Sequence, residues 1–355
     1  MESTRTASTA GAGDTEDDRR SVSDTTGVLL LGACAAWALI TAAAHGGRPE
    51  GMLLAVLAVA AGYASGRILG ALLPVAAPAV GAFTGLGLAL AAPHITAGPQ
   101  FAAPLGHTGA TAALLTLSSG AACCAAWAAG APGYRLAPGL SAAAFAVIAA
   151  ALGSTTGLAA CAGVLLCSLA AGRTRRRGPA LTALALVAAL TTGTTWAVAE
   201  GALPQGLRTM LEDQFSRHRV RLWHDALTLT GRDPALGAGP GRFGELSPTA
   251  AQSLPPDSKP HSAPLQQAAE QGLIGVALLV AVFCWVLYVL WRTSRPTPIA
   301  LTAGAALTAL AVIASVGNAL SFTTVTVGAG TLAGIATARP LRDEGQRKRS
   351  GPSQP

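Results

Sequence analysis

Residues 266–291 read QQAAEQGLIGVALLVAVFCWVLYVLW, and from residue 272 onward this run contains no charged side chain. An apolar run of this length is sufficient to cross a bilayer core of about 30 Å as a helix. Directly before it, His261 and Ser262 end the longest polar stretch between two apolar runs of the chain. A titratable imidazole is therefore expected where an aqueous loop meets a membrane span.

The rest of the chain has the same character. Of its 355 residues, 51% are hydrophobic and only 12% are charged, against about 25% charged in soluble domains. Because the bilayer core offers no water to the backbone, each long apolar run predicts a helix. The sequence thus predicts an all-α polytopic membrane protein of about ten transmembrane helices, with one large loop between the seventh and the eighth. The predicted spans are 27–45, 51–66, 68–92, 107–129, 136–152, 157–172, 179–199, 266–291, 298–316 and 320–338.

Basic residues indicate the orientation of these spans. If the N-terminus is cytoplasmic, the basic loop residues fall almost entirely on the cytoplasmic side, and the short outer loops hold only Arg48. The cytoplasmic set comprises Arg67, Arg135, Arg173, Arg175, Arg176, Arg177, Arg292 and Arg295, with further basic residues in both tails.

The predicted divisions follow from these spans and this orientation. They are a disordered cytoplasmic tail (1–26), helices one to seven (27–199), an extracytoplasmic catalytic loop (200–265), helices eight to ten (266–338) and a basic cytoplasmic tail (339–355). The expected location is the plasma membrane, with multiple passes and both termini cytoplasmic.

Two other function classes are disfavoured by composition. The net charge of +7 does not indicate nucleic-acid binding, because the basic residues lie mostly in short loops between apolar runs. The six cysteines all lie in apolar runs and have no metal-ligand spacing, so no metal, cofactor or disulfide framework is expected. Small residues dominate the spans instead, which predicts closely packed helices.

An amphipathic helix is predicted in the large loop over residues 205–230. Its polar side carries Arg208, Arg217, Arg219 and Arg221. One interpretation is a helix on the membrane surface with snorkelling arginines. The other is an anion-binding surface that faces the bundle. Basic residues are normally depleted in extracytoplasmic loops, and a phosphate ligand would explain these arginines because it binds arginine through bidentate hydrogen bonds.

A glycine-rich segment follows over residues 233–244. Its Gly239, Gly241 and Gly244 fit a GxGxxG pattern, but Pro240 interrupts it and no predicted strand precedes it, so a dinucleotide site is not indicated. A tight turn that places Arg242 near the membrane surface fits the segment better.

His261 lies at the predicted start of the helix after this loop. Ser262 can cap that helix and Pro264 fits its first turn. The positive helix end favours a neutral imidazole and an anionic phosphate nearby. The alternative is a histidine whose ring only forms a hydrogen bond within the loop and takes no part in chemistry. Glu270 is nine residues further on and is a candidate partner of the site.

Three motifs together resemble the O-antigen ligase and polymerase family, over about residues 215–280. The first is His261-Ser262 followed by Gly272 and Gly275. The second is Arg219-x-x-x-Trp223-x-x-Ala226-Leu227, and the third is the turn Pro234-Ala235-Leu236-Gly237-Ala238-Gly239 ending at Phe243.

The resemblance implies a membrane glycosyltransferase that moves a glycan from an undecaprenyl-pyrophosphate carrier to an acceptor glycan, lipid or protein. It implies neither a metal nor another cofactor. His261 would be the catalytic base and Arg219 would hold the pyrophosphate. Substrate binding is further assigned to Arg217, Arg221, Arg242 and Glu270.

Two departures and two alternatives accompany this interpretation. Ser262 replaces the family's usual Asn, and Ser154-Thr155-Thr156-Gly157 lacks the arginine of a Ser-Arg pair that many members carry. An inactive relative in an assembly complex therefore stays possible. The alternative from another class is a transporter or flippase, although the spans show no evident repeat and few ionisable residues.

Overall fold

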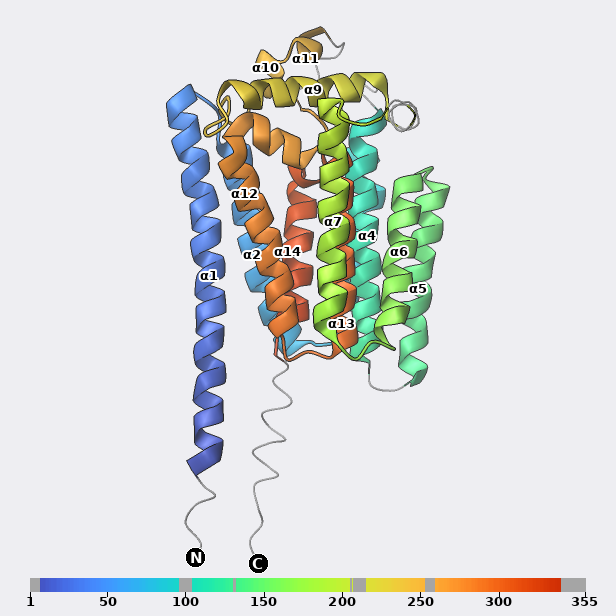
Figure 1. Cartoon of the computed structure of the whole chain (residues 1–355). Helices are drawn as coiled ribbons and strands as arrows, with labels where there is room; N and C mark the ends of the chain where they lie inside the picture. Colours follow the sequence, from blue (N-terminus) through green and yellow to red (C-terminus); the bar gives the residue numbers. More distant parts are fainter. Residues whose placement is uncertain are drawn as a thin grey trace, which may run out of the picture.

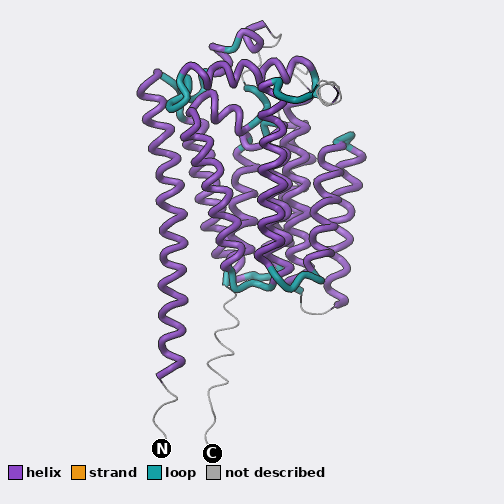
Figure 2. Tube along the Cα trace, viewed as in Figure 1, coloured by secondary structure: helices purple, strands orange, loops and turns teal. Residues whose placement is uncertain are grey.

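The computed structural model describes residues 7–95, 104–129, 132–204, 206, 215–252 and 259–339, and within these ranges the regular structure is entirely helical. The long helices run side by side, and α9 lies across one end of the bundle, with α10 and α11 above it (Figures 1 and 2). The elements are α1 (Ala7–His45), α2 (Glu50–Leu72), α3 (Ala76–Ile95), α4 (Pro104–Ala128), α5 (Pro132–Ala151), α6 (Thr155–Ala171), α7 (Arg177–Glu200), α9 (Arg217–Arg232), α10 (Phe243–Leu246), α11 (Pro248–Gln252), α12 (Ala263–Arg292), α13 (Thr297–Val316), the 3-10 helix η1 (Ala319–Ser321) and α14 (Thr323–Thr337).

Among the described residues, six helices are long and apolar enough to cross a membrane. They are Ser23–His45 of α1, α2, Gly109–Ala128 of α4, α7, α12 and α13. Three shorter apolar helices accompany them, at Ala76–Ala91, Gly139–Ala151 and Thr155–Ala171. The predicted class, an all-helical multi-pass membrane protein, is therefore confirmed.

The predicted break between the second and third spans is wrong. Arg67 does not lie in a loop but inside α2, which continues to Leu72. The chain turns at Leu73, whose backbone is not helical, because the following Pro74 disfavours a helical residue before it and lacks an amide hydrogen to donate.

Helix α1 also differs from the prediction. It begins at Ala7, so that most of the polar segment 1–26, which was predicted to be disordered, continues the first span as a helix. Its residue Asp24 forms an ion pair with Arg67 of α2, which gives the polar extension a partner in the bundle.

Glycines bring α2 and α14 into direct backbone contact. A Cβ on Gly62 or Gly66 of α2 would collide with the backbone of Val327 or Thr331, and Gly334 of α14 closely approaches the backbone of Tyr63. The four-residue spacing puts these glycines on one helix face. Close packing through small residues, as predicted, holds this pair together.

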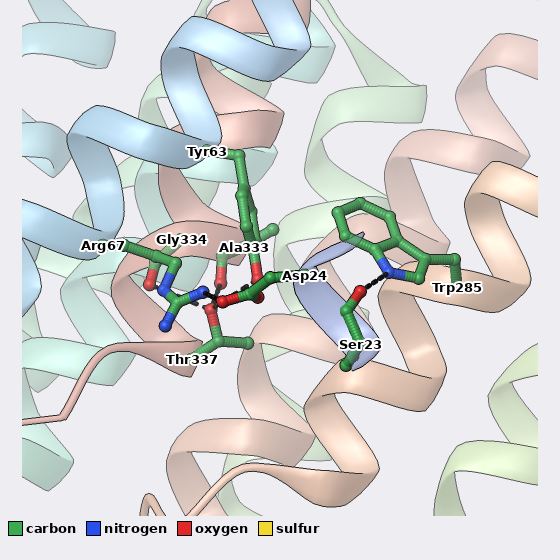
Figure 3. A network of polar contacts seen from close by, with 8 residues as sticks. All are labelled: Ser23, Asp24, Tyr63, Arg67, Trp285, Ala333, Gly334 and Thr337. Atoms are coloured by element: carbon green, nitrogen blue, oxygen red, sulfur yellow. Dashed lines mark hydrogen bonds and ion pairs between the residues drawn. The ribbon is translucent and has the colours of Figure 1, made fainter. Parts of the chain in front are cut away.

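A polar network fastens α1 to the bundle at the end opposite to α9 (Figure 3). Besides the Asp24–Arg67 pair, the Arg67 guanidinium lies 5.8 Å from the centroid of the Tyr63 ring. Trp285 of α12 donates to the carbonyl of Ser23 at 3.1 Å, and its ring lies 5.2 Å from that of Tyr63. Helices α1, α2 and α12 are thus joined at this end.

Arg295 locks the same end of the bundle from the turn between α12 and α13. The side chain is 4% exposed, and it donates to the carbonyls of Gly70 and Ala338, both at 2.7 Å. These carbonyls end α2 and α14, where the helix dipoles are negative and the last carbonyls lack helical partners.

Arg295→Met is expected to lower the free energy of unfolding by about 2–4 kcal/mol, because two buried carbonyls lose a charged donor. Denaturant unfolding of the purified protein in detergent measures this difference. Arg232→Met, at an exposed arginine of α9, is the control and should change stability by less than about 0.5 kcal/mol. An equal effect of both changes would contradict the role of Arg295.

Candidate active site

Helix α9 covers the end of the bundle through its apolar face. Ser216 begins the helix, and its hydroxyl accepts the amide hydrogen of Arg219. Leu222, Trp223 and Ala226 are fully buried and pack with residues of α7 and α12. The predicted helix is confirmed from Arg217 onward, while residues 205 and 207–214 lie outside the described residues.

The arginines of α9 divide between two sides. Arg217 and Arg221 are exposed, and since they are four residues apart they share one side of the helix. Arg219 is about 200° away from Arg217 around the axis, and its Nη1 donates to the carbonyl of Val316 at 3.1 Å. Of the three arginines, Arg219 therefore faces the bundle, at the C-terminal end of α13.

A break in α12 organises the site. Gly272 has φ +67° and ψ −170°, a conformation open essentially to glycine, and it divides α12 into a buried arm, 263–271, and the membrane span. The break leaves carbonyls of the arm without their usual helical donors. The amides of Ala238 and Gly239 donate to the carbonyls of Ala269 and Glu270, at 2.8 and 3.0 Å.

Two further groups at the break also find partners. Leu273 donates its amide hydrogen to the carbonyl of Pro234 at 2.8 Å, and the indole of Trp37 donates to the carbonyl of Gln271 at 3.0 Å. The glycine-rich turn and α1 together satisfy the broken helix, so the three are one structural unit.

The turn and the broken helix lie so close that only glycine fits. A Cβ on Gly237 would lie 2.6 Å from the amide nitrogen of Gly272, and a Cβ on Gly272 would collide with the carbonyl of Ala235. Gly237, Gly239 and Gly241 all have positive φ. The interpretation as a tight turn is therefore confirmed, and no strand precedes it among the described residues.

Glu270 connects this unit to Lys259, in the segment that precedes His261. Its side chain is 6% exposed, and the backbone amides of Gly241 and Phe243 act on its carboxylate as hydrogen-bond donors. Gln266 donates to the same carboxylate at 3.4 Å, and the charge of Lys259 acts on it. Glu270 is thus enclosed by protein groups, an arrangement that favours a positioning role over direct contact with substrate.

Lys259 is the basic partner of Glu270, two residues before His261. Burial lowers the pKa of Lys259 from its ordinary value of 10.5, and the charge of Glu270 partly opposes this shift. Between the lowered pKa and 10.5 the unfolded chain binds more protons than the folded protein, so stability rises with pH in this window.

Lys259→Met is expected to remove this rise. Unfolding free energies measured between about pH 8 and about pH 10.5 should increase less steeply for the variant than for the wild type, by no more than about 1.4 kcal/mol per pH unit. Parallel curves for the two proteins would contradict the burial of the Lys259 ammonium.

His261 has a strained backbone. Its φ is +52°, and among the described residues it is the sole non-glycine with positive φ. Such conformations persist where surrounding contacts enforce them, and they concentrate at functional sites. Here the imidazole follows buried Pro260 and precedes the first turn of α12.

Ser262 occupies the N-cap position of α12, but its hydroxyl does not cap the helix, so that expectation is wrong. The extended backbone of Ser262 leaves its Oγ buried and without a hydrogen-bond partner among the described residues. Pro264 fits the first turn as predicted. The helix start beside His261 therefore has an unused hydroxyl group next to its positive end.

Arg242 fastens the glycine-rich turn to the end of α1. Its Nη1 donates to the carbonyl of His45 at 2.6 Å, and its Nε lies 4.0 Å from the Glu245 carboxylate. His45 in turn lies 3.7 Å from the Asp233 carboxylate. These contacts favour a positioning role for Arg242 as well.

Some parts of the site escaped the sequence reasoning. Asp225, next to the Trp223 motif residue, accepts from the Ser247 hydroxyl at 2.5 Å and the Thr249 amide at 3.0 Å, which ties α9 to α11. Trp37 was also missed. Neither has a local signal, because their partners are 22 or more residues away.

Comparison with known proteins gives one match. A family model described as O-antigen ligase matches residues 140–280, from within α5 to the first part of the α12 span, and so includes α9, the glycine-rich turn and the broken helix but not α1. The chain matches no curated protein and no solved structure. The resemblance inferred from the three motifs is confirmed, and residues 140–280 of this membrane protein are similar to the O-antigen ligase family.

Proposed function

We propose that the protein transfers a glycan from an undecaprenyl-pyrophosphate carrier to an acceptor hydroxyl during assembly of a surface polysaccharide or glycoconjugate. The observation that carries this proposal is the strained His261 directly before α12, whose arm packs against α9, the helix that presents Arg219 to the bundle. A base and a bundle-facing cation on neighbouring elements suit transfer from a pyrophosphate leaving group.

In the proposed step, the His261 imidazole accepts the proton of the acceptor hydroxyl. The acceptor oxygen forms a bond to the anomeric carbon while the bond from that carbon to the pyrophosphate oxygen breaks. Undecaprenyl pyrophosphate leaves with the electron pair. Arg219 stabilises the charge that develops on the leaving group, an electrostatic contribution.

The other candidate residues are assigned supporting roles. Arg217 and Arg221 are exposed on the outer side of α9 and are proposed to attract the anionic donor. Arg242 and Glu270 are proposed to hold the glycine-rich turn, α1 and the arm of α12 in the geometry that positions His261.

The proposed topology has ten spans, both termini in the cytoplasm and residues 200–265 outside. One observation supports it: the backbone amide of Arg48, in the turn between α1 and α2, donates to the carbonyl of Pro240 in the glycine-rich turn at 2.7 Å. Both turns therefore lie at one end of the bundle. A reporter fused after residue 250 should be active only outside the cytoplasm. Activity only in the cytoplasm would contradict this orientation.

Arg219→Ala is expected to lower kcat/KM for transfer by about 100- to 1,000-fold, because one preorganised donor to the developing charge is lost. Purified protein in vesicles, supplied with a radiolabelled undecaprenyl-pyrophosphate glycan, gives this measurement. Arg217→Ala and Arg221→Ala should cost less than about tenfold, as expected for exposed charges.

The matched control is Arg232→Ala, at an exposed arginine at the far end of α9. Thermal unfolding of every variant separates a loss of chemistry from loss of the Arg219–Val316 contact. If Arg219→Ala and Arg232→Ala had equal activity, Arg219 would not hold the pyrophosphate.

A further inference from the structure

The end of the bundle opposite to α9 has a dense basic surface. Arg173, Arg175 and Arg176 follow α6 and are exposed, and Arg292 is exposed at the end of α12. No described residue forms a salt bridge with any of these four arginines. The adjoining sequence, residues 166–180 and 281–300, contains no acidic residue. Its positive charge therefore has no counter-charge within these segments.

Arg177 fixes this surface in place. Its Nε donates to the Thr297 hydroxyl at 3.0 Å and its Nη1 to the carbonyl of Thr293 at 2.6 Å, with a further bond to the carbonyl of Arg295. The turn between α6 and α7 is thereby joined to the turn between α12 and α13. The four exposed arginines are held on one rigid rim rather than on separate loops.

Aromatic and apolar side chains adjoin the arginines. Trp291 is 48% exposed beside Arg292, whose guanidinium lies 5.8 Å from its ring centroid. Its Nε1 lies 3.7 Å from where a Cβ on Gly178 would be, which places the ring beside the start of α7. Exposed Tyr288 and Leu169 lie four residues before Arg292 and Arg173, respectively.

This combination indicates a specific kind of partner. A soluble anion would need only the arginines, whereas a phospholipid also needs apolar surface directly beside the charges for its acyl chains. Exposed tryptophan and tyrosine at a span end are typical of the membrane interface, and basic clusters there attract anionic headgroups. We infer that the rim of Arg173, Arg175, Arg176 and Arg292, with Trp291, binds an anionic phospholipid.

Binding of phosphatidylglycerol tests this inference. Purified full-length protein in neutral detergent is mixed with phosphatidylglycerol and phosphatidylcholine of identical acyl chains, and native mass spectrometry counts the lipids retained. Wild-type protein should retain phosphatidylglycerol in preference. Arg173→Gln/Arg176→Gln should weaken its retention by about tenfold or more, since each basic residue contributes separately. Trp291→Leu should weaken it about threefold or more.

A matched control removes the same amount of charge elsewhere. Arg48→Gln/Arg232→Gln lies at the opposite end of the bundle, at two exposed arginines, and should retain phosphatidylglycerol as the wild type does. If both double variants lost phosphatidylglycerol retention equally, the loss would be an effect of net charge alone, and the proposed site would be overturned. Complete displacement of the lipid by inorganic phosphate at the same concentration would also overturn it, because a phospholipid site requires the acyl chains.

Discussion

Replacing His261 by alanine is expected to reduce glycan transfer by about 100- to 10,000-fold while the protein keeps its fold. This range is what a positioned general base contributes when it accepts a proton in the transition state. The substitution removes the imidazole without opening a core cavity, because His261 precedes the arm and its side chain is only partly buried. It also leaves the Glu270 contacts in place.

The expected effect is a loss of kcat with little change in KM. Donor binding rests on the arginines, whereas the imidazole acts on the acceptor hydroxyl as the new bond forms. Transfer from a radiolabelled undecaprenyl-pyrophosphate glycan, measured with the purified protein, gives both constants. His224→Ala is the matched control, because this histidine of α9 is exposed and outside the proposed site.

Two outcomes would contradict the proposal for different reasons. Full transfer by His261→Ala would show that the protein is a transferase but that His261 is not its catalytic base. No turnover by either protein, with labelled glycan crossing the vesicle membrane, would instead favour the transporter. Because phosphatidylglycerol retention is measured without any transfer, neither outcome affects the inference about the basic rim.

The parts of the fold that sequence could predict are those with local causes. A run such as 266–291 is read as a span because length and apolar character alone decide the matter. The tight turn at residues 237–241 follows from glycine spacing in the same way. The end of α2 shows the limit of this approach: the charge of Arg67 predicts a loop at residue 67, whereas Pro74 is the residue that marks where the helix ends.

The parts that sequence missed depend on contacts between distant segments. Nothing near Gly272 reveals that its helix breaks, because the break is stable only where Pro234, Gly239 and Trp37 supply the hydrogen bonds that it leaves open. The roles of Arg242 and Glu270 were unpredictable for the same reason. Their residue types suit substrate binding, but their partners are groups on α1 and in the turn.

Helix α1 connects the two ends of the molecule in this arrangement. At one end Asp24 pairs with Arg67, and at the other Trp37 binds the broken part of α12 while His45 accepts a hydrogen bond from Arg242. A helix outside the matched region 140–280 thus completes the geometry of the candidate site. The first span is therefore part of the structural unit that holds the candidate site together.

Gly272→Ala is expected to have the largest effect on structure, with a loss of about 3 kcal/mol or more in the free energy of unfolding and no detectable transfer. Alanine is disfavoured at φ +67° and ψ −170°, and its Cβ would collide with the carbonyl of Ala235. Relief of the collision must separate the turn from α12. That separation leaves the carbonyls of Ala269 and Glu270 buried without donors, at a cost of about 1–3 kcal/mol each.

The matched control is Gly231→Ala, a change of the same size in α9. A Cβ there meets nothing within 4 Å, and alanine in a helix is favoured over glycine by up to about 1 kcal/mol. Gly231→Ala should therefore unfold at the wild-type temperature or slightly above it and keep its transfer activity. Gly272→Ala should unfold at a lower temperature and lose transfer. If Gly272→Ala kept the stability and activity of Gly231→Ala, α12 would tolerate a straight helix at residue 272. The docking of the glycine-rich turn could then not be what positions His261.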